Sequence, residues 1–225
     1  MRCQVGFTID KMSAEQILKY AGSETMSITG TLTMKGDVSA EGATISDLKK
    51  TARGTATLLM EKGSLRRFPV LSKVFSILNV SQLLNFELPD MVTDGMPYTS
   101  IRGKFSLNGG ILTTRDLFVN SGAMNMSLVG RADIVREELD TVIGIKPLQT
   151  VDKVVSKIPI VGWILTDDKK SLITVYFKAQ GKWSDPTVDA IPVRSMERGV
   201  LDIFKRVFQL PEKLITDTGE VIMGR

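Results

Sequence analysis

Hydrophobic and polar residues alternate along most of this chain with the period of two that half-buried strands show. The longest alternating run covers residues 26–40, where every second residue is apolar or glycine. At about 3.3 Å per residue, one straight strand of this length would span roughly 50 Å. Ordinary strands have about 5–6 residues. The run therefore predicts either a strand that bends at a glycine or a strand of an elongated sheet.

A meander of strands is predicted for residues 98–147. Turn signals at Asn108-Gly109-Gly110, Asn120-Ser121-Gly122 and Arg136-Glu137-Glu138 divide this stretch. Because the links between its strands are short, neighbouring strands should run antiparallel. The predicted strands of the whole chain are 3–10, 26–40, 52–61, 100–107, 111–119, 123–134, 139–146 and 172–183.

Amphipathic helices are predicted between these strands. Ser13 with Gln16 forms a capping-box pattern for a short helix, and Pro69 can start a helix with an apolar stripe. The other predicted helices are a short one at 45–50, one at 148–158 and one at 198–208. Residues 159–165 form an apolar patch shorter than the ~18 residues that a membrane span needs.

The expected fold is α+β and dominated by β-structure. We expect an elongated, twisted, mostly antiparallel sheet that forms an apolar groove, with amphipathic helices capping its face and end. Residues 1–97 would form a strand and helix segment of the groove, 98–190 the meander with an inserted helix, and 191–225 C-terminal helices and a tail. These three parts are expected to form one continuous domain, a fragment of a longer chain.

The composition excludes several classes of chemistry. The chain has no histidine and only one cysteine, Cys3, which excludes Ser-His-Asp or Cys-His nucleophilic sites and His-ligated zinc. The adjacent acidic pairs Asp167-Asp168 and Glu137-Glu138 are typical of turns. The net charge is only +4, and no basic cluster interleaved with aromatic residues indicates nucleic-acid binding. We therefore expect no enzyme activity, no cofactor, no metal site and no nucleic-acid partner.

Two interpretations remain open for the apolar face of the sheet. The helices can pack on it and seal an ordinary core, or part of it can stay open as a groove. The alternating strands outnumber the helices available to cover them, and methionines such as Met34 and Met126 lie on strand faces. Methionine adapts to variable apolar ligands. An aliphatic groove would suit acyl chains, whose burial is worth about 0.8 kcal/mol per CH₂.

Short motifs follow one another at 27–34, 43–48, 53–56, 61–68, 71–79, 103–112, 129–133 and 181–188. Their order along the chain resembles the C-terminal region of the AsmA-like family of bacterial envelope proteins, which includes YhdP and TamB relatives. The resemblance covers nearly the whole chain.

This resemblance implies a piece of a long periplasmic protein that is anchored in the inner membrane, with the anchor outside this fragment. Such proteins form an elongated β-groove with an apolar lumen and are associated with phospholipid movement to the outer membrane. The resemblance thus implies a lipid-binding or lipid-transfer module, part of a periplasm-spanning groove that carries phospholipid between the two membranes.

The alternative is a structural or assembly module of the envelope with a sealed core and no lipid cargo. The expected partners are phospholipid acyl chains, together with a membrane or an envelope protein that contacts the C-terminal helices. The candidate lipid-binding residues are those on the apolar strand faces: Met26, Ile28, Leu32, Met34, Leu58, Met60, Ile101, Phe105, Leu107, Met124, Met126, Leu128, Ile143, Ile145, Val175 and Phe177.

Overall fold

The computed structural model describes residues 2–20, 27–78, 95–148, 164–166 and 173–209. The strands in these ranges form one sheet in which every pairing is antiparallel, with the order β1-β3-β4-β5-β6-β7-β8-β10-β11. The eleven strands of this described part are β1 Arg2–Ser13, β2 Ser27–Ile28, β3 Thr31–Glu41, β4 Arg53–Arg66, β5 Met96–Asn108, β6 Ile111–Asn120, β7 Met124–Asp133, β8 Glu138–Pro147, β9 Ile164–Thr166, β10 Ile173–Lys182 and β11 Thr187–Ala190.

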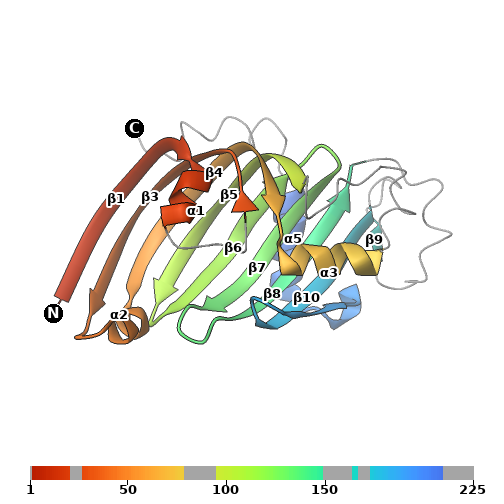
Figure 1. Ribbon diagram of the computed structural model, residues 1–225. Coiled ribbons are helices and arrows are strands. Elements are labelled where there is room, and N and C mark those ends of the chain that lie inside the picture. Colours follow the sequence, from red (N-terminus) through yellow and green to blue (C-terminus); the bar gives the residue numbers. More distant parts are fainter. Residues whose placement is uncertain (1, 21–26, 79–94, 149–163, 167–172, 210–225) are drawn as a thin grey trace.

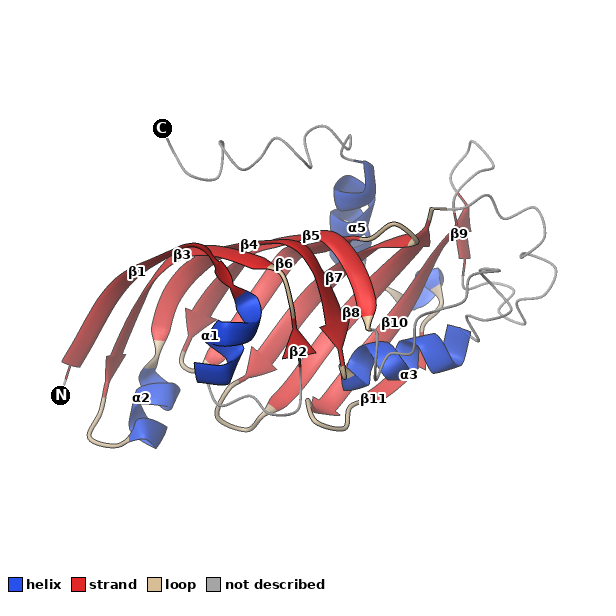
Figure 2. Ribbon diagram, turned by 45° about the horizontal axis from the view of Figure 1, so that its top comes forward, coloured by secondary structure: helices blue, strands red, loops and turns tan. Residues whose placement is uncertain are grey.

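The sheet is long, twisted and curved, so that it has a concave and a convex face (Figure 1). The helices are α1 Ala14–Tyr20, α2 Ile45–Thr51, α3 Pro69–Leu78 and α5 Arg198–Gln209, with a 3₁₀ turn at Val193–Ser195. Figure 2 shows α1 and α3 on the concave side and α5 on the opposite side of the sheet. The predicted β-dominated α+β fold with a mostly antiparallel sheet is therefore confirmed.

The long alternating run bends at a glycine, which was one of the two predicted outcomes. Gly30 has a φ of +116°, and a Cβ there would lie 2.7 Å from the Glu61 carbonyl oxygen and from the Tyr98 hydroxyl. The run therefore divides into β2 and β3, both paired with β4. The Tyr98 hydroxyl donates a hydrogen bond to the Thr29 carbonyl oxygen at 2.6 Å, which ties the bend to the floor of the sheet.

Local sequence signals account for the short helices. At α1 the backbone N–H of Gln16 donates to the Ser13 Oγ at 3.4 Å, as the capping pattern predicts. At α2 a complete capping box joins Thr44 and Asp47, which the sequence analysis did not identify. The hydrogen bonds from Thr44 hold the pKa of Asp47 below its usual value.

The described strands also depart from the prediction at the C-terminal end. Ile164 and Leu165, the last residues of the predicted apolar patch, belong to β9, and the rest of that patch lies outside the described residues, as does the predicted helix from residue 149 onward. The short strand β11 was not predicted. It follows the predicted turn at Asp185-Pro186 and pairs with β10.

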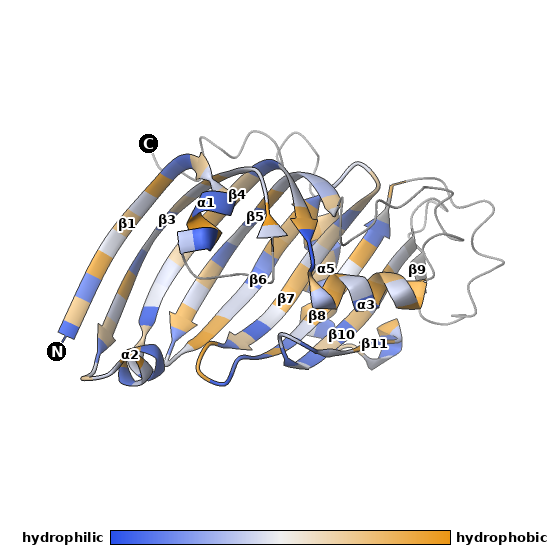
Figure 3. Cartoon of the chain, viewed as in Figure 1, coloured by the Kyte–Doolittle hydropathy of each residue, from blue (hydrophilic) through white to orange (hydrophobic). Residues whose placement is uncertain are grey.

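The apolar core has two parts, one on each face of the sheet. The larger lies on the concave face, where Val74, Phe75 and other buried residues of α3 cluster with those of the strands. The smaller lies under α5 and contains Phe118 and Val207. Figure 3 shows the alternation that separates the two faces as bands of apolar and polar residues along β1 and β3. No helix in the described part of the chain is long and apolar enough to cross a membrane.

Candidate functional site

The concave face carries apolar side chains in register across neighbouring strands. One cross-strand row runs through Leu117, Leu128, Ile143 and Phe177 on β6, β7, β8 and β10. The next row along these strands runs through Val119, Met126, Ile145 and Val175. Because side chains on one face recur at every second residue, these rows form a continuous apolar floor across four strands.

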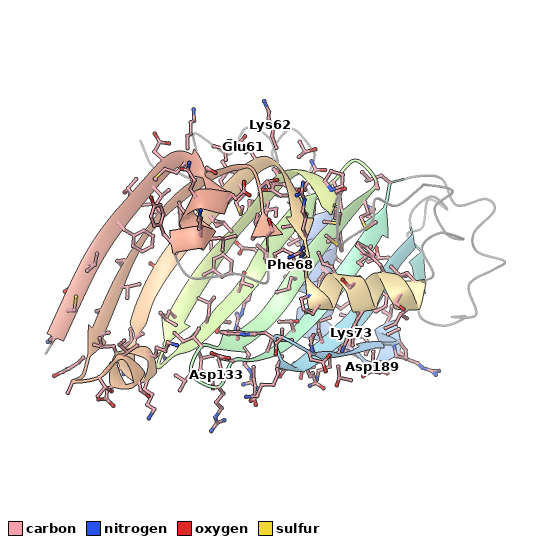
Figure 4. The ribbon with its side chains drawn as sticks, in the orientation of Figure 1. Glu61, Lys62, Phe68, Lys73, Asp133 and Asp189 are labelled. Atoms are coloured by element: carbon pink, nitrogen blue, oxygen red, sulfur yellow. The ribbon has the colours of Figure 1, made fainter. Side chains whose placement is uncertain are left out.

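Part of this floor stays uncovered and forms a hollow with a volume of about 360 Å³. That volume lies within the range of about 300–1,000 Å³ that is usual for ligand pockets. The hollow is open on one side, and almost all of its surface is apolar. Its walls come from β2, β4, β5, β6, β7 and β8, with Phe68, Val70 and Leu71 closing it at the start of α3. Figure 4 shows Phe68 at this position.

The structure brings half of the sixteen candidate residues together in the hollow. These eight are Ile28, Leu58, Met60, Ile101, Phe105, Met126, Leu128 and Ile143. Six others belong to the larger apolar core or pack against it without lining the hollow, namely Leu32, Met34, Met124, Ile145, Val175 and Phe177. Leu107 is half-buried and lies outside the hollow, and Met26 lies outside the described residues.

Helix α3 explains why the β10 end of the floor is sealed. It lies over the β8 and β10 side of the concave face (Figures 1 and 2), and its residues Leu71, Val74, Phe75 and Leu78 are buried. Phe177 is 0% exposed and Val175 is 3% exposed. A charged residue in place of Phe177 is therefore expected to unfold this region.

A polar contact links α3 to the far edge of the sheet. The Lys73 ammonium donates to the Asp185 carboxylate at 2.5 Å and to the Pro186 carbonyl oxygen at 2.7 Å. Both acceptors lie in the turn between β10 and β11. Figure 4 shows Lys73 pointing from α3 toward this hairpin. The helix is thus fixed at its start by the chain that leaves β4 and near its middle by this contact.

Sequence reasoning missed the wall residues on β6 and before α3. Leu112, Leu117 and Val119 line the hollow, but the β6 register shifts between Thr114 and Leu117 against both neighbouring strands. A bulge of this kind breaks strict alternation, so the pattern did not place these residues on the apolar face. Phe68 precedes the predicted helix, and its role was not visible from periodicity.

One polar row interrupts the apolar floor. Across the strands, Thr114 of β6 pairs with Gly130 of β7, and Gly130 pairs with Thr141 of β8. All three residues line the hollow. Both threonines are 7% exposed. A Cβ at Gly130 would lie 2.5 Å from the Asp140 carbonyl oxygen, so only glycine fits there without a shift of the backbone.

Ionisable groups are nearly absent from the walls of the hollow. Among the described residues of its lining, Arg131 is the one charged residue, and its guanidinium pairs with Asp140 at 3.2 Å. Within the described residues, no group of three or more His, Cys, Asp or Glu side chains could hold a metal ion. The chemistry that this lining provides is the burial of apolar groups.

Comparison with protein families gives one match over most of the chain. The family model described as YhdP protein matches residues 1–188. Comparisons with curated proteins and with solved structures found no match. The matched residues include every strand from β1 to β10 and therefore the whole hollow. On this match, the chain belongs to the YhdP family.

Proposed function

We propose that this chain is a non-enzymatic lipid-binding and lipid-transfer module. Its concave face would hold phospholipid acyl chains, as part of a groove that crosses the periplasm between the inner and outer membranes in a chain anchored to the inner membrane. The observation that carries the proposal is the apolar hollow of about 360 Å³ on the floor of the sheet. Membership of the YhdP family supports a place in the bacterial envelope.

The energetics of the hollow suit an acyl chain. Each buried CH₂ group contributes about 0.8 kcal/mol, so a segment of roughly ten methylenes would gain about 8 kcal/mol before the cost of ordering the ligand. This gain needs no directional contact, which agrees with a lining that is almost wholly apolar. Met60 and Met126 lie in the walls, and their flexible thioethers can adjust to chains of different length and unsaturation.

A structural or assembly module of the envelope is the second candidate. The observation that favours it is the sealed section under α3, where Val175 and Phe177 are already buried by protein. In that case the hollow would be an imperfection of an ordinary core. The two candidates differ in whether a ligand occupies the hollow.

The experiment that separates them is native mass spectrometry of the chain purified without detergent. Leu58 and Leu59 are adjacent on β4 and both are half-buried, but only Leu58 lines the hollow. We expect phospholipid adducts on the unmodified chain, loss of these adducts in Leu58→Asp, and their retention in Leu59→Asp. Circular dichroism and urea unfolding of both variants verify that each is folded.

The Leu59→Asp variant is the matched control, because it places the same charge on the opposite face of the same strand. Leu128→Asp repeats the test on β7. If the unmodified chain carries no lipid, or if Leu58→Asp and Leu59→Asp lose lipid equally, the acyl-chain proposal is wrong and the sealed module is favoured.

A further inference from the structure

The convex face carries a trough beside α5 that is lined mostly by polar and charged residues and has a volume of about 1,150 Å³. Strands β3, β4, β5 and β6 form its floor, and Arg206 of α5 reaches its edge. Thr57 lies in this floor, whereas its neighbour Leu58 lines the hollow. Because adjacent residues of a strand point to opposite faces, the trough and the hollow lie on opposite sides of the sheet. We call this feature the basic trough.

Two lysines of the basic trough lie in one cross-strand row. Lys35 pairs with Thr57, and Thr57 pairs with Lys104. Neighbouring strands are about 4.8 Å apart, so the two lysines are separated by roughly 10 Å at their backbones. The small threonine side chain between them donates its hydroxyl to the Lys35 carbonyl oxygen at 3.3 Å. It therefore leaves space between the two ammonium groups.

Two arginines add to this charge. Arg115 comes from the irregular part of β6, and Arg206 comes from the solvent side of α5. All four cationic residues, Lys35, Lys104, Arg115 and Arg206, are exposed. None of the ion pairs formed among the described residues involves any of them.

The two carboxylates of the basic trough accept hydrogen bonds from neighbouring groups of its floor. The Asp37 carboxylate accepts a hydrogen bond from the Thr55 hydroxyl at 2.8 Å. The Asp116 carboxylate accepts a hydrogen bond from the backbone N–H of Lys104 at 2.8 Å. Burial lowers the pKa of the half-buried Arg102, and the charge of Asp116 partly opposes this shift. The four cations are thus only partly offset, and the basic trough has an excess of two positive charges over its carboxylates.

We propose that the basic trough binds a phosphate ester, such as a phosphorylated headgroup. A phosphate group presents several strong acceptor oxygens, and it is recognised by lysines as point charges and by arginines through paired N–H donors. The roughly 10 Å between Lys35 and Lys104 leaves space for one such group above Thr57. This site goes beyond the proposed acyl-chain function, because it lies on the other face of the sheet. Only Phe105 and Thr114 occur in the linings of both the hollow and the basic trough.

The test measures binding of the full chain to two probes by calorimetry and vesicle flotation. The probes are glycerol 3-phosphate and phosphatidylcholine vesicles with or without phosphatidylglycerol. The variant K35Q/K104Q removes two charges from the basic trough. The variant K49Q/K50Q removes two exposed charges from α2 and is the matched control.

We expect K35Q/K104Q to weaken binding by roughly 10- to 100-fold, which corresponds to the loss of one or two charge-assisted contacts. The control should bind like the unmodified chain. Binding of glycerol 3-phosphate would identify the phosphate ester itself as the ligand, and binding only to phosphatidylglycerol vesicles would identify the headgroup in a bilayer. Equal losses in both variants, or no binding of either probe, would overturn the proposal. Phospholipid adducts in the hollow should be unchanged in K35Q/K104Q, so this site and the proposed function can fail separately.

Discussion

Gly144 is the position at which one added methyl group should separate α5 from the sheet. It lies on β8 in a convex-face row with Phe118, Ser127 and Tyr176. The small residues in the middle of this row leave a depression that α5 fills with aromatic rings. A Cβ at Gly144 would lie 2.9 Å from the ring of Phe204. Real Cβ contacts are almost never this short, so Gly144→Ala must displace the helix or the strand.

The size of the effect follows from two opposing contributions. Replacing glycine by alanine in a strand normally stabilises a protein by about 0.4–1 kcal/mol. Overpacking a filled site costs about 1–3 kcal/mol. Phe204 is 0% exposed and makes an edge-to-face contact with Tyr176 at 5.1 Å, so it has little room to move. We therefore expect Gly144→Ala to lower the free energy of unfolding by about 1–2 kcal/mol.

Urea unfolding followed by circular dichroism measures the global effect, and hydrogen exchange of the α5 amides measures the local one. Gly6→Ala is the matched control, because Gly6 lies on β1 of the same sheet and its added Cβ meets nothing within 4 Å. Shortening the opposing ring in Gly144→Ala/Phe204→Leu should recover part of the loss, which a double-mutant cycle detects. If Gly144→Ala is as stable as Gly6→Ala and α5 keeps its protection, the proposed packing is wrong.

Three further predictions test other contacts. Burial raises the pKa of Tyr98 and of Tyr176 to about 12. In the unfolded chain these phenols lose their protons near pH 10. The free energy of unfolding should therefore be unaffected below pH 10 and fall by roughly 2–3 kcal/mol per tyrosine up to pH 12. Urea unfolding across this range should show a shallower fall in Tyr98→Phe, and an unchanged slope would contradict the assignment. Lys73→Met removes the exposed contact to Asp185. We expect the free energy of unfolding to fall by at most about 1 kcal/mol and the amides of α3 to exchange faster. Unchanged exchange would show that this contact does not position the helix. Thr44→Ala removes the N-cap of α2 and should lower the free energy of unfolding by about 1 kcal/mol, which urea unfolding measures. If no loss is seen, this helix contributes little to the stability of the fold.

Strand periodicity was sufficient to predict the sheet, because alternation records which face of each strand is buried. It was less informative about α5, since a helix with an apolar side does not indicate which face of the sheet it covers. The clue lay in a residue that broke the pattern. Tyr176 is an aromatic residue at a position of β10 where the alternation predicts the polar face, and it packs against Phe204 of α5. Exceptions of this kind mark the place where a second layer covers a sheet.

The sequence predicted which face of the sheet carries the candidate residues, but not which part of that face stays uncovered. All the candidate residues of the rows through Leu128 and Met126 were placed on the correct apolar face, yet α3 covers Val175 and Phe177 and leaves Leu128 in the hollow. The location of α3 depends on its anchor at Asp185, which is 112 residues from Lys73 in sequence. A contact over such a distance leaves no periodic signal in the sequence.

The energetics of α3 bear on how much of the concave face an acyl chain could occupy under the proposed function. Four buried apolar side chains of α3, Leu71, Val74, Phe75 and Leu78, contribute roughly 6–12 kcal/mol together at about 1.5–3 kcal/mol each. The exposed Lys73 contact adds at most about 1 kcal/mol, so apolar burial holds the helix and the polar contact sets its position. An acyl chain would need to bury roughly 8–15 methylenes on the same floor to replace that burial, at about 0.8 kcal/mol per CH₂. Because such a chain can enter the hollow without this cost, we expect α3 to remain a fixed wall and the ligand to lie between it and the floor residues of β4 to β7.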